Sequence, residues 1–266
     1  MILGAAGAWY AVRRRRASQR ERLLAAPLPA EWERLLERRV PLYRRVPGEH
    51  RAELNGLINV FVHDKRFIGC NGLEVTDEMR AVIAAQACIL LLNRNTGCYP
   101  GFRTIYVYPG TYLAHETRSE GLLETEETDA RAGESWHRGP VVLSWDDILA
   151  GLEAPDDAFN VVLHEFAHKL DEENDASDGL PILHDPSQYR TWAQVLGKEF
   201  EALRARAARD EPGVIDEYGA ESPAEFFAVA TEAFFERPQA LRRHHPALYE
   251  ELSRFYRLDP GTWHAG

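Results

Sequence analysis

The segment His164-Glu165-Phe166-Ala167-His168 places two histidines four positions apart, with a glutamate directly after the first. A helix advances 3.6 residues per turn, so residues i and i+4 lie on one face and both imidazoles can reach one ion. Glu165 can then lie beside a water that the ion activates, rather than on the ion itself. The spacing therefore predicts a zinc-binding helix in which Glu165 is the general base of a hydrolytic reaction.

The residues around this segment predict a buried helix over 158–173. Apolar side chains precede the motif at Phe159 and 161–163 and continue after it at Phe166 and Leu170, which leaves the polar groups on one stripe. Chance alone produces the same spacing in a small fraction of chains. An unpaired polar group buried in such a helix costs about 1–3 kcal/mol, so the two histidines and the glutamate need partners. A metal ion is a partner that the motif favours.

A catalytic zinc site takes three protein ligands and keeps one position open. In the HExxHxxGxxH pattern the third ligand would be a histidine at position 174, preceded by a glycine at 171. The chain has Asp171 and Asn174 there. The third ligand is therefore expected from another element.

A second helix is predicted over 222–236, with Ser222 as N-cap, a proline in its first turn and an aromatic core face. Glu225 has two interpretations at this stage. It can close the helix end on the Ser222 amide as part of a capping box, or it can be the third zinc ligand. Glu221 and Glu232 remain alternatives for that ligand, and Glu232 shares a helix face with Glu225.

Four segments together resemble the Mlc titration factor A family of zinc peptidases, and the resemblance extends from about Pro27 to about Pro260. These segments are His164-Glu-Phe-Ala-His-Lys-Leu-Asp171, Pro223-Ala-Glu-Phe-Phe-Ala-Val229, Ala84-Ala-Gln-Ala-Cys-Ile-Leu-Leu-Leu-Asn93 and Pro140-Val-Val-Leu-Ser-Trp145. The spacing from Tyr218 to Glu225 is also similar to that in the catalytic domain of anthrax lethal factor, a gluzincin-type zinc peptidase.

The resemblance implies that His164, His168 and Glu225 bind one Zn²⁺ per chain, that Glu165 is the catalytic base, and that Tyr218 stabilises the tetrahedral intermediate. Without it, Tyr218 would be an ordinary loop tyrosine before a helix. Removing an oxyanion donor of this kind typically costs about 3 kcal/mol of transition-state stabilisation.

Two acidic residues are candidates for a hydrogen bond to a zinc-binding histidine, on the ring nitrogen that faces away from the metal. Asp171 follows His168 by three positions, although it is equally suited to be a solvated carboxylate at a helix end. Glu232 is the other candidate, besides being an alternative third ligand.

Charge and cysteine usage narrow the function classes. The net charge is −11, but residues 1–66 hold 14 Lys and Arg against 7 Asp and Glu, so the acidic excess lies in residues 67–266. That acidic body lacks the basic face that a nucleic-acid partner requires. Three cysteines without a CxxC pair predict reduced thiols and a cytoplasmic protein rather than a disulfide framework.

The N-terminus is apolar over 1–12 and is followed by Arg13–16, the reverse of the order in a secretory signal peptide. Twelve helical residues span about 18 Å, short of the roughly 30 Å hydrocarbon core of a bilayer. Residues 1–26 are therefore interpreted as a tail or the remnant of a membrane anchor, which would place the protein at the inner face of the membrane. Residues 27–260 form the expected peptidase domain and 261–266 a C-terminal tail.

The predicted fold class is α+β, a mainly helical single domain with a small mixed sheet, an HExxH helix of the gluzincin type and a second, glutamate-bearing helix. Strands are expected near 103–108 and 140–145, with a weaker one near 73–76. A long loop is expected over 115–138. The expected helices lie near 30–39, 49–66, 77–93, 146–152, 158–173, 187–209, 222–236 and 246–256.

Two functions fit these features. The first is a zinc metallopeptidase acting on a peptide or protein substrate, with aminopeptidase and endopeptidase both open. The second, implied by the resemblance, is a binding protein that sequesters a transcriptional repressor of sugar uptake, with peptidase activity secondary. A purely structural zinc fits poorly, since such sites use four protein ligands that usually include cysteine.

Overall fold

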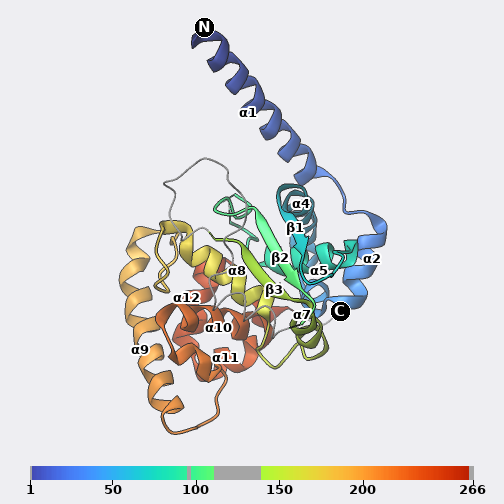
Figure 1. Ribbon diagram of the computed structural model, residues 1–266. Helices are drawn as coiled ribbons and strands as arrows, with labels where there is room; N and C mark the ends of the chain where they lie inside the picture. Colours follow the sequence, from blue (N-terminus) through green and yellow to red (C-terminus); the bar gives the residue numbers. More distant parts are fainter. Residues whose placement is uncertain (1, 95–96, 111–138, 264–266) are drawn as a thin grey trace.

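A three-stranded sheet lies between helices in the computed structural model (Figure 1), which describes residues 2–94, 97–110 and 139–263, with side chains from residue 13 onward. The α+β class predicted from the sequence, mainly helical around a small sheet, is confirmed. The α-helices are α1 (Ile2–Ala25), α2 (Ala30–Arg39), α3 (Pro41–Arg45), α4 (Gly48–Asp64), α5 (Asp77–Ile89), α7 (Trp145–Glu153), α8 (Val161–Asp171), α9 (Tyr189–Ala207), α10 (Pro223–Glu236), α11 (Pro238–His244) and α12 (Pro246–Tyr256).

The sheet has the order β1-β2-β3, formed by β1 (Arg66–Gly69), β2 (Thr104–Tyr108) and β3 (Val141–Ser144). Both pairings are parallel, so the mixed arrangement predicted from the sequence is not found among the described strands. In that part of the chain β3 has one neighbour, β2, and is an edge strand. The expected loop over 115–138 lies outside the described residues.

The strand expected at 73–76 is wrong, and the third strand is β1 instead. The predicted helix over 49–66 includes the first residue of this strand, because α4 ends at Asp64 and β1 begins at Arg66, only two residues later. The Arg66 amide then donates to the Arg103 carbonyl (2.8 Å) and begins the parallel pairing. The residues after β1 turn away from the sheet through Asn71 and Gly72, both at positive φ; this turn leaves 73–76 without a strand partner.

The helices that carry the expected motif residues begin at side-chain caps. Asn160 Oδ1 accepts a hydrogen bond from the Leu163 amide (3.0 Å) at the start of α8, and Ser222 Oγ accepts one from the Glu225 amide (3.1 Å) at the start of α10. Each cap satisfies one of the amides that the first turn of a helix leaves unpaired. Both predicted helices are thus present, but the one expected over 158–173 is α8, Val161–Asp171, and Phe159 lies before it and is exposed.

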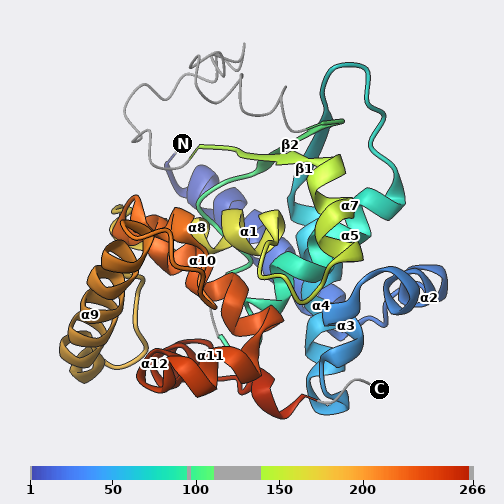
Figure 2. The ribbon, with the colours of Figure 1, turned by 90° about the horizontal axis from the view of Figure 1, so that it is seen from below.

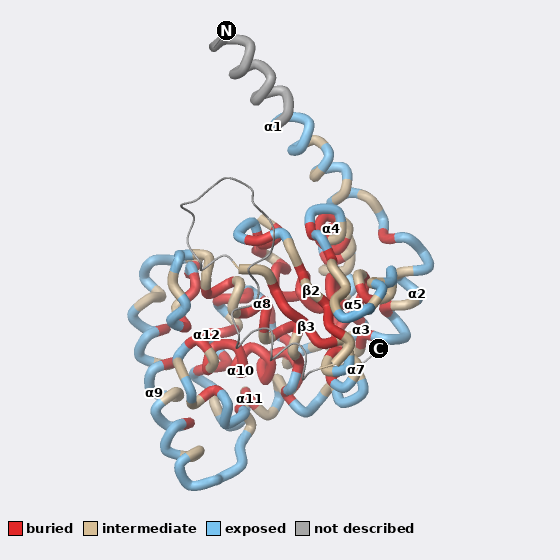
Figure 3. The backbone as a smooth tube through the Cα atoms, in the orientation of Figure 1, coloured by how far each residue is buried: buried red, intermediate tan, exposed pale blue. Residues whose placement is uncertain are grey.

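Aromatic packing places α8 in the middle of the core. The Phe166 ring lies 4.9 Å from Tyr99, 5.5 Å from Phe61 and 5.8 Å from Phe102, measured between ring centroids. Buried residues gather along α8, α10 and the sheet, whereas α9 and residues 13–25 of α1 are largely exposed (Figure 3). The face of α8 that carries Phe166 is therefore anchored, which leaves the opposite face for His164 and His168.

The N-terminal segment is a helix that leaves the body beside α4 (Figure 1). Its last turn lies so close to α4 that a Cβ on Gly56 would sit 2.2 Å from the Leu24 carbonyl oxygen. Asn59 Nδ2 also donates to the carbonyls of Leu23 (3.3 Å) and Ala26 (3.0 Å). Among the helices that the structure describes, none has both the length and the hydropathy of a membrane span. The division into 1–26, 27–260 and 261–266 stays a prediction.

Candidate metal centre

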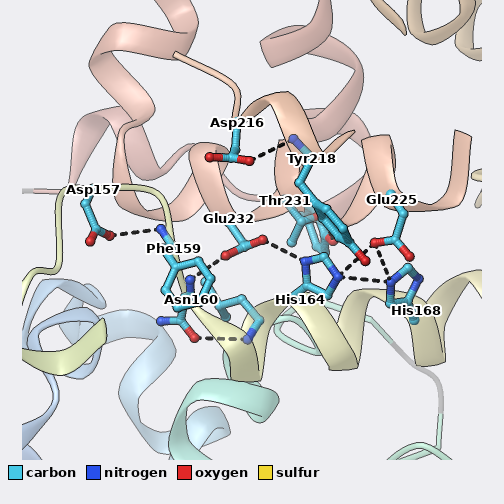
Figure 4. Close-up of polar contacts among 12 residues, drawn as sticks. Asp157, Phe159, Asn160, His164, His168, Asp216, Tyr218, Glu225, Thr231 and Glu232 are labelled. Atoms are coloured by element: carbon cyan, nitrogen blue, oxygen red, sulfur yellow. Dashed lines mark hydrogen bonds and ion pairs between the residues drawn. The ribbon is translucent and has the colours of Figure 1, made fainter. Parts of the chain in front are cut away.

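Two helices distant in sequence bring the expected ligand residues together. α8 and α10 pack against each other (Figures 1 and 2). His164 and His168 lie one turn apart on the face of α8 that meets α10, and Glu225 reaches them from the first turn of α10 (Figure 4). This is the one group of three or more metal-binding side chains that converges among the described residues.

The donor atoms of this group stand at the separations that a tetrahedral zinc site needs. Nε2 of His164 lies 3.0 Å from Oε2 of Glu225, Nε2 of His168 lies 3.3 Å from the same oxygen, and the two Nε2 atoms are 3.2 Å apart. Ligand bonds of about 2.0–2.1 Å in a tetrahedron put neighbouring donors about 3.3 Å apart. Two nitrogens and one carboxylate oxygen at these distances fit three corners of that tetrahedron.

The site favours positive charge. Burial lowers the pKa of His164, but hydrogen bonds to Glu225 and Glu232 outweigh it and raise the pKa to about 10. Burial likewise raises the pKa of Glu225, yet the hydrogen bonds from both histidines hold it well below its ordinary value. The carboxylate of Glu225 therefore favours positive charge between α8 and α10, as a site for a divalent metal requires.

Glu232 fixes the ring of His164 from behind. Its Oε1 lies 2.8 Å from Nδ1 of His164, while its Oε2 accepts a hydrogen bond from the main-chain N–H of Asn160. A carboxylate on Nδ1 orients the imidazole and leaves Nε2 facing Glu225 and His168. Glu232 is almost fully buried, at 2% exposed, so it is held in one position.

Two buried side chains, Gln86 and Glu236, hold Asn160 in the position from which it binds Glu232, and the sequence does not predict them. Asn160 Nδ2 donates to Gln86 Oε1 and to Glu236 Oε1, at 2.8 Å each. Burial raises the pKa of Glu236 to about 8, so this carboxyl is largely neutral at pH 7 and adds little negative charge beside Glu232. No local pattern in the sequence reports these partners of Asn160, which lie on α5 and α10.

The two residues with expected catalytic roles lie next to the ligands. Glu165 follows His164 on α8 and is 5% exposed. Tyr218 belongs to the 3₁₀ turn Glu217–Ala220 before α10, and its ring centroid is 5.9 Å from that of His164. Its ring points toward His164 (Figure 4) and is 44% exposed. Tyr218 thus borders the centre on the side that solvent reaches.

Sequence comparison agrees with this geometry. Residues 12–257 match the profile of the glucose-regulated metallo-peptidase family M90. The chain belongs to this family. It is 42% identical over 242 residues to an uncharacterized protein of Synechocystis sp., covering 90% of this chain and 88% of that protein. It is 32% identical over 226 residues to Mlc titration factor A of Pectobacterium atrosepticum, covering 83% and 84% of the two chains. It is 34% identical to the protein of that name from Edwardsiella ictaluri over 226 residues, or 83% and 85%.

Membership of a metallo-peptidase family implies a metal, and the group formed by His164, His168 and Glu225 is compatible with zinc. The structure separates the three glutamates that the sequence left as candidates for the third position. Glu225 faces the histidines, Glu232 lies behind His164, and Glu221 is exposed and outside the converging group.

Asp171 lies away from solvent in this M90 chain, so the solvated helix-end interpretation is wrong. It is fully buried, and its Oδ2 accepts a hydrogen bond from the Gly179 amide (2.8 Å). Burial raises the pKa of Asp171 to about 6. The observed contact fixes the loop after α8, and a direct role behind a ligand stays a prediction.

Proposed function

We propose that this chain is a zinc-dependent peptidase that hydrolyses peptide bonds, with His164, His168 and Glu225 as the metal ligands. The observation that carries the proposal is the set of 3.0, 3.2 and 3.3 Å separations among three donor atoms from two helices. The buried Glu232 behind His164 supports it, because ligating histidines usually donate their second nitrogen to a carboxylate or carbonyl.

When bound, zinc supplies a Lewis acid that polarises the scissile carbonyl and acidifies a water. The chain's own residues do the rest. Glu165, next to His164 on the same helix, accepts the proton of the attacking water and passes it to the departing amine. Tyr218 donates a hydrogen bond to the oxygen that gains negative charge. Glu232 keeps His164 oriented throughout.

Zinc content tests the ligand assignment. The purified chain should carry about one zinc, and Glu225→Ala should lower the affinity for zinc by more than about 100-fold, because it removes a ligand. Glu232→Ala should lower it by about 10–100-fold, the usual effect of removing a partner behind a ligand. Glu221→Ala is the matched control, since Glu221 is exposed and lies four residues away. Affinities are measured by competition with chelators of graded strength, and equal zinc content in all three variants would contradict the assignment.

The edge strand β3 is the proposed docking strand for the substrate. An extended peptide that pairs with the edge strand of a sheet gains backbone hydrogen bonds, and β3 packs against α8, which carries the proposed ligands His164 and His168. Val142→Pro and Leu143→Pro each remove one amide donor of β3. Because amides alternate in direction along a strand, one of these two variants spares the pairing with β2.

We expect the better-folded proline variant to raise KM for peptides severalfold or to abolish turnover. Val142→Ala and Leu143→Ala keep the amides and serve as controls for the lost side chains. Circular dichroism and zinc content identify which proline variant folds. If the proline variant that folds keeps the KM of the unchanged chain, β3 is not the docking strand.

A second activity, capture of a transcriptional repressor, is favoured by one observation. Several relatives at 30–34% identity carry the name Mlc titration factor A, which points to a protein partner called Mlc.

We propose a cytoplasmic location, which three free cysteines, two of them buried, support.

A further inference from the structure

A cavity of about 630 Å³ lies between α1, the end of α4 and the segment 98–103. This volume is in the usual range for sites that bind small molecules. Its floor includes Tyr99 and Phe102, whose rings pack on Phe166. Phe166 is two residues from both His164 and His168 and thus lies on the other face of α8. The cavity is therefore separate from the candidate metal centre.

Five arginine and lysine side chains line this cavity, in a protein whose net charge is −11. They are Arg13, Arg16 and Arg20 of α1, Lys65 directly after α4 and Arg103 directly before β2. Asp64 is the one carboxylate among the described lining residues, and its Oδ1 is 2.9 Å from Nδ1 of His63. Three of the arginines, at positions 16, 20 and 103, form no ion pair in the described part of the chain. The lining therefore has an uncompensated positive charge.

Lys65 fixes the wall of the cavity opposite α1. Its Nζ donates to the carbonyls of Tyr99 (2.5 Å) and Phe102 (2.7 Å) and lies 4.0 Å from the centroid of the Phe102 ring. Burial lowers the pKa of Lys65 to about 8, and a bound anion would favour its charged form. The last turn of α1 is held on α4 at Gly56 and Asn59, and Gln19, next to Arg20, has its Nε2 2.8 Å from Nε2 of His63. The cationic side chains thus extend from segments that tertiary contacts hold in place.

We propose that this cavity binds a phosphate-bearing anion. Guanidinium groups bind phosphate oxygens through paired N–H donors, and the arginines reach the cavity from both walls. Two sources offer the same chemistry, the headgroup of an anionic phospholipid and a soluble phosphate compound. The sequence favours the lipid, because residues 2–12 of the same helix are mostly apolar and lead directly into Arg13–16. Apolar helices with adjoining basic residues bind anionic membrane surfaces.

The test compares two double variants of the full chain. Arg16→Gln with Arg20→Gln removes two charges from the cavity, whereas Arg14→Gln with Arg15→Gln removes two from the same helix at positions that do not line it. Glutamine keeps a helix propensity close to that of arginine. Arg103→Gln removes one charge from the opposite wall and is independent of α1.

Two probes distinguish the sources. One is sedimentation with vesicles of phosphatidylglycerol and phosphatidylcholine, against vesicles of phosphatidylcholine alone; the other is calorimetry with inorganic pyrophosphate. We expect binding to at least one probe, weakened on the order of tenfold or more by the cavity variant and severalfold by Arg103→Gln, with the control variant within about threefold of the unchanged chain. Binding to anionic vesicles alone assigns the lipid, and binding to pyrophosphate assigns a soluble phosphate.

Three results would overturn the proposal. The first is no binding to either probe. The second is binding that all the variants leave unchanged. The third is an equal loss in the two double variants, which would show diffuse attraction between the basic helix and the anion rather than a site. None of these readouts depends on peptidase activity, so the outcome is independent of the proposed function.

Discussion

Replacing Glu165 with glutamine should lower kcat/KM for peptide hydrolysis on the order of 10²–10⁴-fold or more, the usual contribution of a general base. The glutamine keeps the size of the side chain but cannot accept the proton of the attacking water. Glu165 is not one of the three converging donors, so zinc content should stay at the level of the unchanged chain. The measurement is digestion of a peptide library followed by kinetics on the best substrate.

Glu221→Gln is the matched control, because it removes one carboxylate charge near the same helices at an exposed position. Its turnover should stay within about twofold. A Glu165→Gln chain that cuts peptides at the unchanged rate would show that Glu165 is not the base and that the proposed mechanism is wrong.

The same variant separates catalysis from capture of a repressor. A change of one acid to its amide at this buried position leaves the outer surface unaltered, so any partner surface should persist. A pull-down in which Glu165→Gln retains Mlc while peptide hydrolysis is lost would assign both activities to one chain. Loss of both together would instead place the partner at the metal centre.

The helices of the centre could be predicted because their signals are local. The i, i+4 spacing of His164 and His168 and the capping residue Ser222 lie within a few residues of the features they determine. The proximity of Glu225 to the histidines does not follow from a local signal. Spacing alone left Glu221 and Glu232 open, and only the packing of α10 on α8 separates the three glutamates.

The support behind His164 could not be predicted, because its contacts are distant in sequence. Glu232 meets His164 across 68 positions, and Asn160 meets Gln86 across 74. No periodicity in the sequence reports such pairs. The strand at Arg66–Gly69 was missed for a different reason, since four residues that follow a long helix almost directly carry too little alternation to be distinguished from its end.

The features of the centre that sequence reasoning missed are the ones that fix its geometry. The side chains of Glu236 and Gln86 accept hydrogen bonds from the side chain of Asn160 and hold it in place. The main-chain N–H of Asn160 donates to Glu232, and Glu232 orients His164. The centre is thus assembled by α5, α8 and α10 together. The motif on α8 places His164, Glu165 and His168, the two proposed ligands and the proposed base, whereas the tertiary fold brings Glu225 to them and fixes the rings in place.

Replacing Tyr218 with phenylalanine should lower kcat for peptide hydrolysis on the order of 10²–10³-fold, the range found when one oxyanion donor is removed. The hydroxyl is proposed to donate to the substrate oxygen only as negative charge develops there, so KM should change little. Because the side chain is 44% exposed and the ring is retained, the fold and its contact with His164 should persist.

Three measurements check this expectation, namely steady-state kinetics, zinc content and thermal unfolding. Tyr189→Phe is the matched control, since Tyr189 is also a partly exposed tyrosine and its hydroxyl accepts a hydrogen bond from the Leu183 amide (3.2 Å). Loss of that contact should lower stability slightly and leave kcat nearly unchanged. If Tyr218→Phe raises KM with kcat intact, the tyrosine binds the ground state of the substrate. If neither constant changes, it has no part in the reaction, and oxyanion stabilisation must come from other groups around the metal centre.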